Sequence, residues 1–105
     1  MTRPTLEPQV IGVLRRAPDA PELSEWELDE LQDRHVAYQL QQHEAGQLTR
    51  GGPFSDQPDE ALRGLNLYTT TLDEARELAA ADPAVVAGRL AIDVFTWWTA
   101  PRERA

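Results

Sequence analysis

The stretch from Leu72 to Trp98 most constrains the fold, because it joins a helix, a proline break and a strand in close succession. Good helix formers fill residues 72–81 and predict the helix. Pro83 disfavours helical geometry at the residue before it, so the helix is predicted to end at Asp82. One short helical turn and an alternating strand over residues 90–97 are predicted to follow.

Asp82 therefore lies at the corner between two elements, and two interpretations of it stay open. In the first, Asp82 is only the N-cap of the short turn that Pro83 begins. In the second, its carboxylate also takes part in chemistry, which requires a partner side chain from earlier in the chain.

Composition bounds the function classes. The chain has 105 residues, enough for one domain, and a net charge of −8, which argues against nucleic acid or an anionic membrane surface as partner. It contains neither cysteine nor lysine, which excludes disulfides, thiol nucleophiles and Schiff-base chemistry. The two histidines and the carboxylates show no metal-ligand spacing, so we expect neither metal nor cofactor. No signal peptide or membrane-length apolar run is seen, so a cytoplasmic location is the default expectation.

The rest of the chain divides into a core and two loose ends. Residues 1–9 contain two prolines and predict a flexible arm, residues 10–99 the folded domain, and residues 100–105 a charged tail. Within the domain, three further strands are predicted over residues 10–14, 47–54 and 62–69. A capping box at Ser24 and Glu27 predicts a second helix, which should end near Glu44 with Gly46 as its stop.

This second helix places a histidine on its inward face. Leu28, Leu31, His35 and Tyr38 recur at helical spacing, so His35 lies in the middle of the apolar stripe. It is either a hydrogen-bonded core histidine or a residue of a pocket. The second histidine, His43, falls nearer the polar flank and is interpreted as solvated.

The predicted order is strand, helix, strand, strand, helix, strand, which is the α+β, ferredoxin-like split βαβ pattern. Two helices should cover one face of a four-stranded antiparallel sheet. The other face carries Ala91, Phe95 and Trp97 of the last strand and has no cover within the chain. A largely apolar open face on a small protein predicts a partner, so we expect a homodimer packed face to face as an α/β-barrel-like assembly.

Three motifs, in order along the chain, carry a resemblance to a known family. They are His35 with the following Val-Ala-Tyr and the later Gly46, the pair Gly52-Pro53, and the run 81–88 followed by a strand that ends Thr-Trp-Trp. From Val10 to about Trp98 the chain resembles the YCII-related (YciI-like) proteins. The resemblance implies a dimeric ferredoxin-like fold and an active site built around a His and an Asp, which here are His35 and Asp82.

Two function classes stay open after this comparison. The first is a cofactor-free acid/base enzyme, of lyase or isomerase type, in which a His35–Asp82 dyad abstracts a proton from a small organic molecule. The second is a non-catalytic module that binds a small ligand or another protein in the same dimer cleft. A third possibility is that the pocket is closed and the dimer is a component of a larger assembly. Residues expected to bind the ligand in either case are Tyr38, Gly52, Pro53 and Trp97.

Two weaker candidates concern negatively charged groups. The Gly51-Gly52 pair could offer backbone N–H groups to an oxyanion, although such pairs also occur as turns or bulges. Arg50 or Arg63 could bind an anionic substrate, or either could be a solvated strand residue. The sequence does not identify the substrate.

Overall fold

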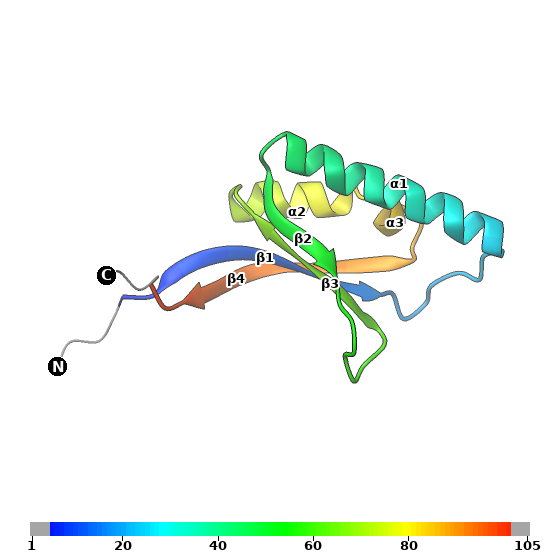
Figure 1. Ribbon diagram of the computed structural model, residues 1–105, viewed down its shortest axis with the longest axis horizontal. Helices are drawn as coiled ribbons and strands as arrows, with labels where there is room; N and C mark the ends of the chain where they lie inside the picture. Colours follow the sequence, from blue (N-terminus) through cyan, green and yellow to red (C-terminus); the bar gives the residue numbers. More distant parts are fainter. Residues whose placement is uncertain (1–4, 102–105) are drawn as a thin grey trace.

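Four antiparallel strands in the order β2-β3-β1-β4 form the sheet, and all the helices lie on one face of it (Figure 1). The computed structural model describes residues 5–101. The elements are β1 (Glu7–Arg16), α1 (Glu25–Glu44), β2 (Leu48–Pro53), β3 (Leu62–Tyr68), α2 (Leu72–Ala80), α3 (Pro83–Val86) and β4 (Leu90–Thr99). This confirms the predicted α+β, ferredoxin-like order.

The paired strands β1, in the middle of the sheet, and β4, at its edge, are longer than predicted. They pair without interruption from Glu7 opposite Thr99 to Arg16 opposite Leu90, so the first strand begins before Val10 and includes part of the predicted flexible arm. Pro8 is tolerated because β3 pairs with β1 only from Val10 onward, so at Pro8 the strand has a single neighbour. The resulting two-stranded ribbon projects beyond the helices toward the termini (Figure 1). Residues 1–4 of the predicted arm and residues 102–105 of the predicted tail lie outside the described residues.

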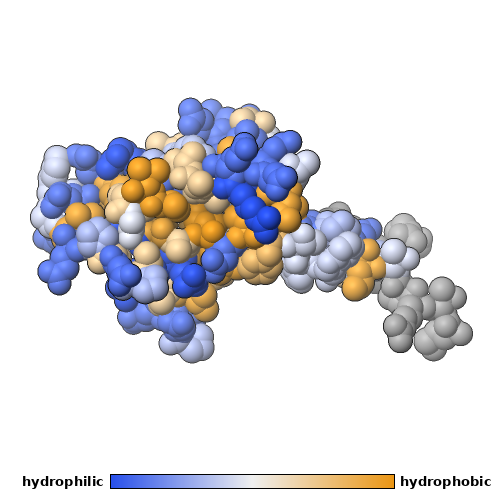
Figure 2. Space-filling model, turned by 180° about the vertical axis from the view of Figure 1, so that it is seen from behind, coloured by the Kyte–Doolittle hydropathy of each residue, from blue (hydrophilic) through white to orange (hydrophobic). Residues whose placement is uncertain are grey.

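The hydrophobic core lies between the sheet and α2. Buried side chains of Leu48, Tyr68 and Val94 from three strands meet Ala75 and Ala79 of the helix. The two alanines let α2 approach the sheet closely, since neither side chain extends beyond its β-carbon. Seen from behind, hydrophobic residues gather across the middle of the molecule (Figure 2).

Helix α1 begins and ends as its sequence predicts. The Ser24 hydroxyl accepts from the Glu27 backbone N–H, and the Ser24 backbone N–H donates to the Glu27 carboxylate, which lowers the pKa of Glu27. Gly46 adopts φ of 73° just beyond the helix, a conformation that favours glycine. The inward face is partly polar, with His35 and Gln42 buried alongside Leu31.

A buried amide pair ties α1 to the sheet. Gln39 donates from Nε2 to Asn66 Oδ1 at 2.9 Å, and Asn66 returns a hydrogen bond from Nδ2 to Gln39 Oε1 at 3.2 Å. Asn66 is only 1% exposed, so its amide depends on this partner. Gly51 on β2 leaves room for the pair, because a β-carbon there would lie 2.6 Å from Asn66 Oδ1.

We predict that Gly51→Ala destabilises the protein by about 1–3 kcal/mol, because the Asn66 amide must turn away and lose its bond to Gln39. Gly52→Ala is the matched control, since a β-carbon there meets nothing within 4 Å, and its effect should stay within about 0.5 kcal/mol. Urea unfolding at one protein concentration measures both changes. Equal midpoints for the two variants would contradict the steric role of Gly51.

Candidate functional site

His35 and Asp82 meet below the surface of a cavity, although 47 positions separate them in the sequence. The His35 Nδ1 atom lies 2.7 Å from Asp82 Oδ2 and 3.0 Å from Oδ1. Asp82 is 1% exposed and His35 is 9% exposed. The carboxylate is therefore shielded from water, and the imidazole reaches the surface only in part.

Local backbone structure fixes the carboxylate in this position. Helix α2 stops before Pro83, and Asp82 takes an extended conformation as the N-cap of α3. Its Oδ1 accepts a hydrogen bond from the Ala84 N–H at 2.8 Å. Both sequence interpretations of Asp82 thus hold together, because one oxygen caps α3 while the carboxylate also contacts His35.

The pair defines how the imidazole can act. An ionised carboxylate only accepts hydrogen bonds, so the proton of a neutral His35 lies on Nδ1. The Nε2 lone pair is then directed away from Asp82. Because His35 lines the cavity, Nε2 is the nitrogen available to a bound molecule. This arrangement suits a general base whose orientation and tautomer are set by a buried acid.

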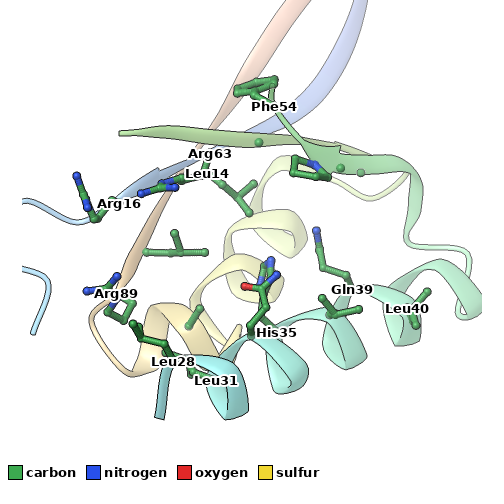
Figure 3. A pocket seen from close by; sticks show the side chains of 18 of the residues that line it. Leu14, Arg16, Leu28, Leu31, His35, Gln39, Leu40, Phe54, Arg63 and Arg89 are labelled. Carbon is green, nitrogen blue, oxygen red and sulfur yellow. The ribbon is translucent and has the colours of Figure 1, made fainter. Parts of the chain in front are cut away.

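The cavity lies between α1, the β2–β3 hairpin and the ends of β1 and β4, and its volume is about 640 Å³ (Figure 3). That volume is in the usual range for sites that bind small organic molecules. Much of its lining is apolar, including Leu14, Leu28, Leu31, Leu40 and Phe54. The lining also carries charged and polar side chains, among them Arg16, Arg63, Arg89 and Gln39, so a ligand with an apolar body and a polar group fits the cavity.

The structure brings some of the predicted ligand-binding residues to this cavity and leaves others apart. Gly52 and Pro53 line it, together with Gly51. Trp97 lies on the projecting part of β4, is 50% exposed and is not among the lining residues. Tyr38 is also outside the lining.

Tyr38 and Tyr68 flank the buried pair. The Tyr38 hydroxyl donates to the Leu78 carbonyl at 2.7 Å and so joins α1 to α2. Burial raises the pKa of Tyr38, and the negative charge of Asp82 raises it further. Burial and Asp82 also raise the pKa of Tyr68, against the lowering effect of its hydrogen bond with Asn66. Both phenols are therefore neutral hydrogen-bonding groups at ordinary pH.

Several lining residues escaped the sequence analysis. His43, interpreted as solvated, is half-buried and lines the cavity, because the cavity extends along successive turns of α1. Gln39 also lines it, and its place one helical turn after His35 was the only signal. Arg16 and Arg89 join Arg63 at the cavity, whereas Arg50 does not. The sequence around each of these arginines gives no sign that the three side chains line one cavity.

Within residues 5–101, no three His, Asp or Glu side chains cluster closely enough to hold a metal ion. Over the same residues, no helix has the length and apolar character needed to cross a membrane.

Comparisons with known proteins identify a family and a similar fold. The YCII-related domain family matches residues 13–98 of the chain. Curated protein sequences give no match. Among solved structures, the chain is similar to 5-chloro-2-hydroxyhydroquinone dehydrochlorinase from Burkholderia phenoliruptrix AC1100 in complex with 2,5-dihydroxybenzoquinone. The TM-score is 0.52 at 17% identity, over 84% of this chain and 92% of that one, so the likeness concerns the fold.

We predict that ¹⁵N spectra of the neutral imidazoles show the Nδ1–H tautomer for His35, because Asp82 accepts from Nδ1. In Asp82→Ala the tautomer should shift toward Nε2–H. His43, which has no carboxylate partner among the described residues, is the internal control and should not change. An Nε2–H tautomer for His35 in the unmodified protein would contradict the proposed orientation.

Proposed function

The chain belongs to the YCII-related family, and on this premise we propose that it is a small acid/base enzyme that abstracts a proton from a small organic molecule. The observation that carries the proposal is the buried His35–Asp82 bond, which leaves Nε2 facing a cavity of about 640 Å³. In this proposal His35 is the base, and Asp82 is the residue that orients it.

The proposed reaction is balanced without a cofactor. His35 Nε2 takes a proton from an acidic carbon, and the electrons of the broken C–H bond form a new double bond. In an elimination, a leaving group on the neighbouring carbon departs with its bonding pair; in an isomerisation, the imidazolium returns the proton to another carbon. The buried charge of Asp82 stabilises the imidazolium between the two steps.

The surroundings of the pair favour this chemistry. Asp82 is 1% exposed, and this burial strengthens its electrostatic contact with a charged His35. Gly52 and Pro53, the predicted ligand-binding residues that line the cavity, would contact the substrate. The similar dehydrochlorinase is in complex with a small cyclic molecule, which supports small ring compounds as the first substrates to try.

We also propose that two copies pack through the open face of the sheet. Strand pairing places Ile11, Val13, Leu65, Leu67 and Phe95 on the side opposite the helices. Phe95 is 44% exposed, a large apolar residue without cover within residues 5–101. A second copy would bury this face. The projecting ribbon would then extend beside the partner, where Trp97 could contribute to ligand binding.

We predict that His35→Gln lowers turnover by about 10²–10⁴-fold, because it removes the base and leaves the cavity otherwise intact. Asp82→Asn keeps an acceptor for the Ala84 N–H and should lower turnover less. The assay screens halogenated phenols, hydroquinones and lactones for halide release and absorbance change. Arg34→Gln, on the exposed side of α1, is the control and should retain full turnover.

The two remaining outcomes of that screen decide between function classes. Turnover that survives in His35→Gln would exclude the proposed base. Ligands that bind the cavity without turnover in any variant would favour the non-catalytic binding module.

We predict that Phe95→Glu weakens the homodimer by at least roughly tenfold, because it puts a charge into an apolar interface. Val86→Glu is the matched control, since Val86 is 74% exposed on α3 and away from the sheet face. Light scattering coupled to size exclusion, over a range of concentrations, measures the dissociation. A monomeric unmodified protein at all concentrations would refute the dimer.

A further inference from the structure

We propose that the cavity recognises an organic anion, with a carboxylate or similar oxyanion held by Arg16, Arg63 and Arg89 and an apolar body beside His35. This deepens the proposed function, because it names the substrate class of the same site. Nothing in the family match specifies such a charge preference.

The charge of the cavity is opposite to that of the whole protein. The chain has a net charge of −8, with 18 acidic residues against ten arginines. Yet the cavity is lined by three arginines and only one carboxylate, that of Asp29, besides His35 and His43. A concave site of positive charge on an acidic protein attracts anions selectively. In a chain with so few basic residues, three arginines at one cavity indicate a function in binding rather than chance.

Arg63 reaches the cavity because β3 bulges. Leu14 pairs with Gly64 and Arg15 pairs with Leu62, so Arg63 has no partner in β1. Regular alternation would put Arg63 on the open face with Leu65, two positions later. The bulge instead turns Arg63 to the helix side, where it lines the cavity.

The cavity arginines also differ from their neighbour Arg15 in how they are paired. Arg15 forms an ion pair with Asp93 at 2.8 Å. Within residues 5–101, no carboxylate pairs with Arg16, Arg63 or Arg89. Arg89 donates from Nη1 to the Pro21 carbonyl at 3.0 Å, which anchors the side chain and leaves its charge uncompensated. Guanidinium groups that have no carboxylate partner are suited to bind an oxyanion through two hydrogen bonds.

The arrangement separates a charged end from an apolar end. Arg16, Arg63 and Arg89 lie together at one end of the cavity, His35 lies near its middle, and Leu40 lies toward the other end (Figure 3). A volume of about 640 Å³ is far larger than an inorganic ion needs. An anion with a hydrophobic ring or chain fills the site and brings its carbon atoms to His35.

Binding of 4-fluorobenzoate, compared with its uncharged analogue 4-fluorobenzamide, tests the proposal by ¹⁹F and ¹H–¹⁵N NMR titration at low ionic strength. We expect the benzoate to bind about tenfold more tightly than the benzamide and to shift the amide signals of Gly51 and Gly52. Added salt should weaken only the benzoate. Equal affinities, or no saturable benzoate binding, would overturn the proposal.

Variants of single arginines identify which residues bind the negative charge of benzoate. Arg63→Gln and Arg16→Gln should each weaken benzoate binding by about three- to tenfold and leave benzamide binding unchanged. Arg34→Gln removes the same charge from α1 outside the cavity and should change neither. An equal loss in Arg34→Gln would attribute the preference to overall charge and refute the site.

Two further titrations distinguish recognition of an organic anion by the arginines from binding of any small anion and from recognition by His35. Inorganic phosphate should compete more weakly than benzoate, because it lacks an apolar body; equal or stronger competition would refute recognition of an organic anion. The His35→Gln variant should still bind benzoate. Loss of benzoate binding in this variant would show that His35, and not the arginines, recognises the charge. Since these titrations need no turnover, the anion site can fail while the acid/base function stands, and the reverse.

Discussion

The bond between His35 and Asp82 is the contact on which the candidate site depends. It joins the middle of α1 to the corner between α2 and α3, and both ends are buried. A buried carboxylate is unfavourable unless it is hydrogen-bonded, and Asp82 meets this need with two donors, the imidazole and the Ala84 N–H. The same contacts that stabilise the corner therefore also present Nε2 of His35 to the cavity.

The cavity exists because α1 does not close against the sheet with apolar side chains. Its inward face carries His35, Gln39 and Gln42, and the Gln39–Asn66 amide pair spans the space to β3. Gly51 lets this pair form without a clash. Polar residues at these positions leave a hollow that a leucine-rich helix would fill, so a cavity takes the place of part of the core.

Irregular strand pairing brings one of the three arginines to the cavity. A shift of one residue in a strand moves side chains to the opposite face of the sheet, and the bulge in β3 does this for Arg63. Arg16 and Arg89 arrive from the ends of β1 and of the α3–β4 connection. The opposite face carries apolar residues such as Phe95 together with the ion pair between Arg15 and Asp93. We therefore propose chemistry on the helix side of the sheet and association on the other.

The sequence alone determined the order of elements, the caps at Ser24 and Asp82, and the inward position of His35. These are local properties, because capping, proline geometry and helical spacing act within a few residues. The His35–Asp82 pairing itself came from family resemblance.

Only the tertiary structure decided which distant side chains share the cavity. The gathering of Arg16, Arg63 and Arg89, and the exclusion of Tyr38 and Trp97 from the lining, depend on strand register, on a bulge and on the placing of α1 over the sheet. The extra pairing of β1 with β4 was likewise hidden by Pro8. Such features arise from contacts between segments far apart in the chain, and local periodicity carries no signal for them.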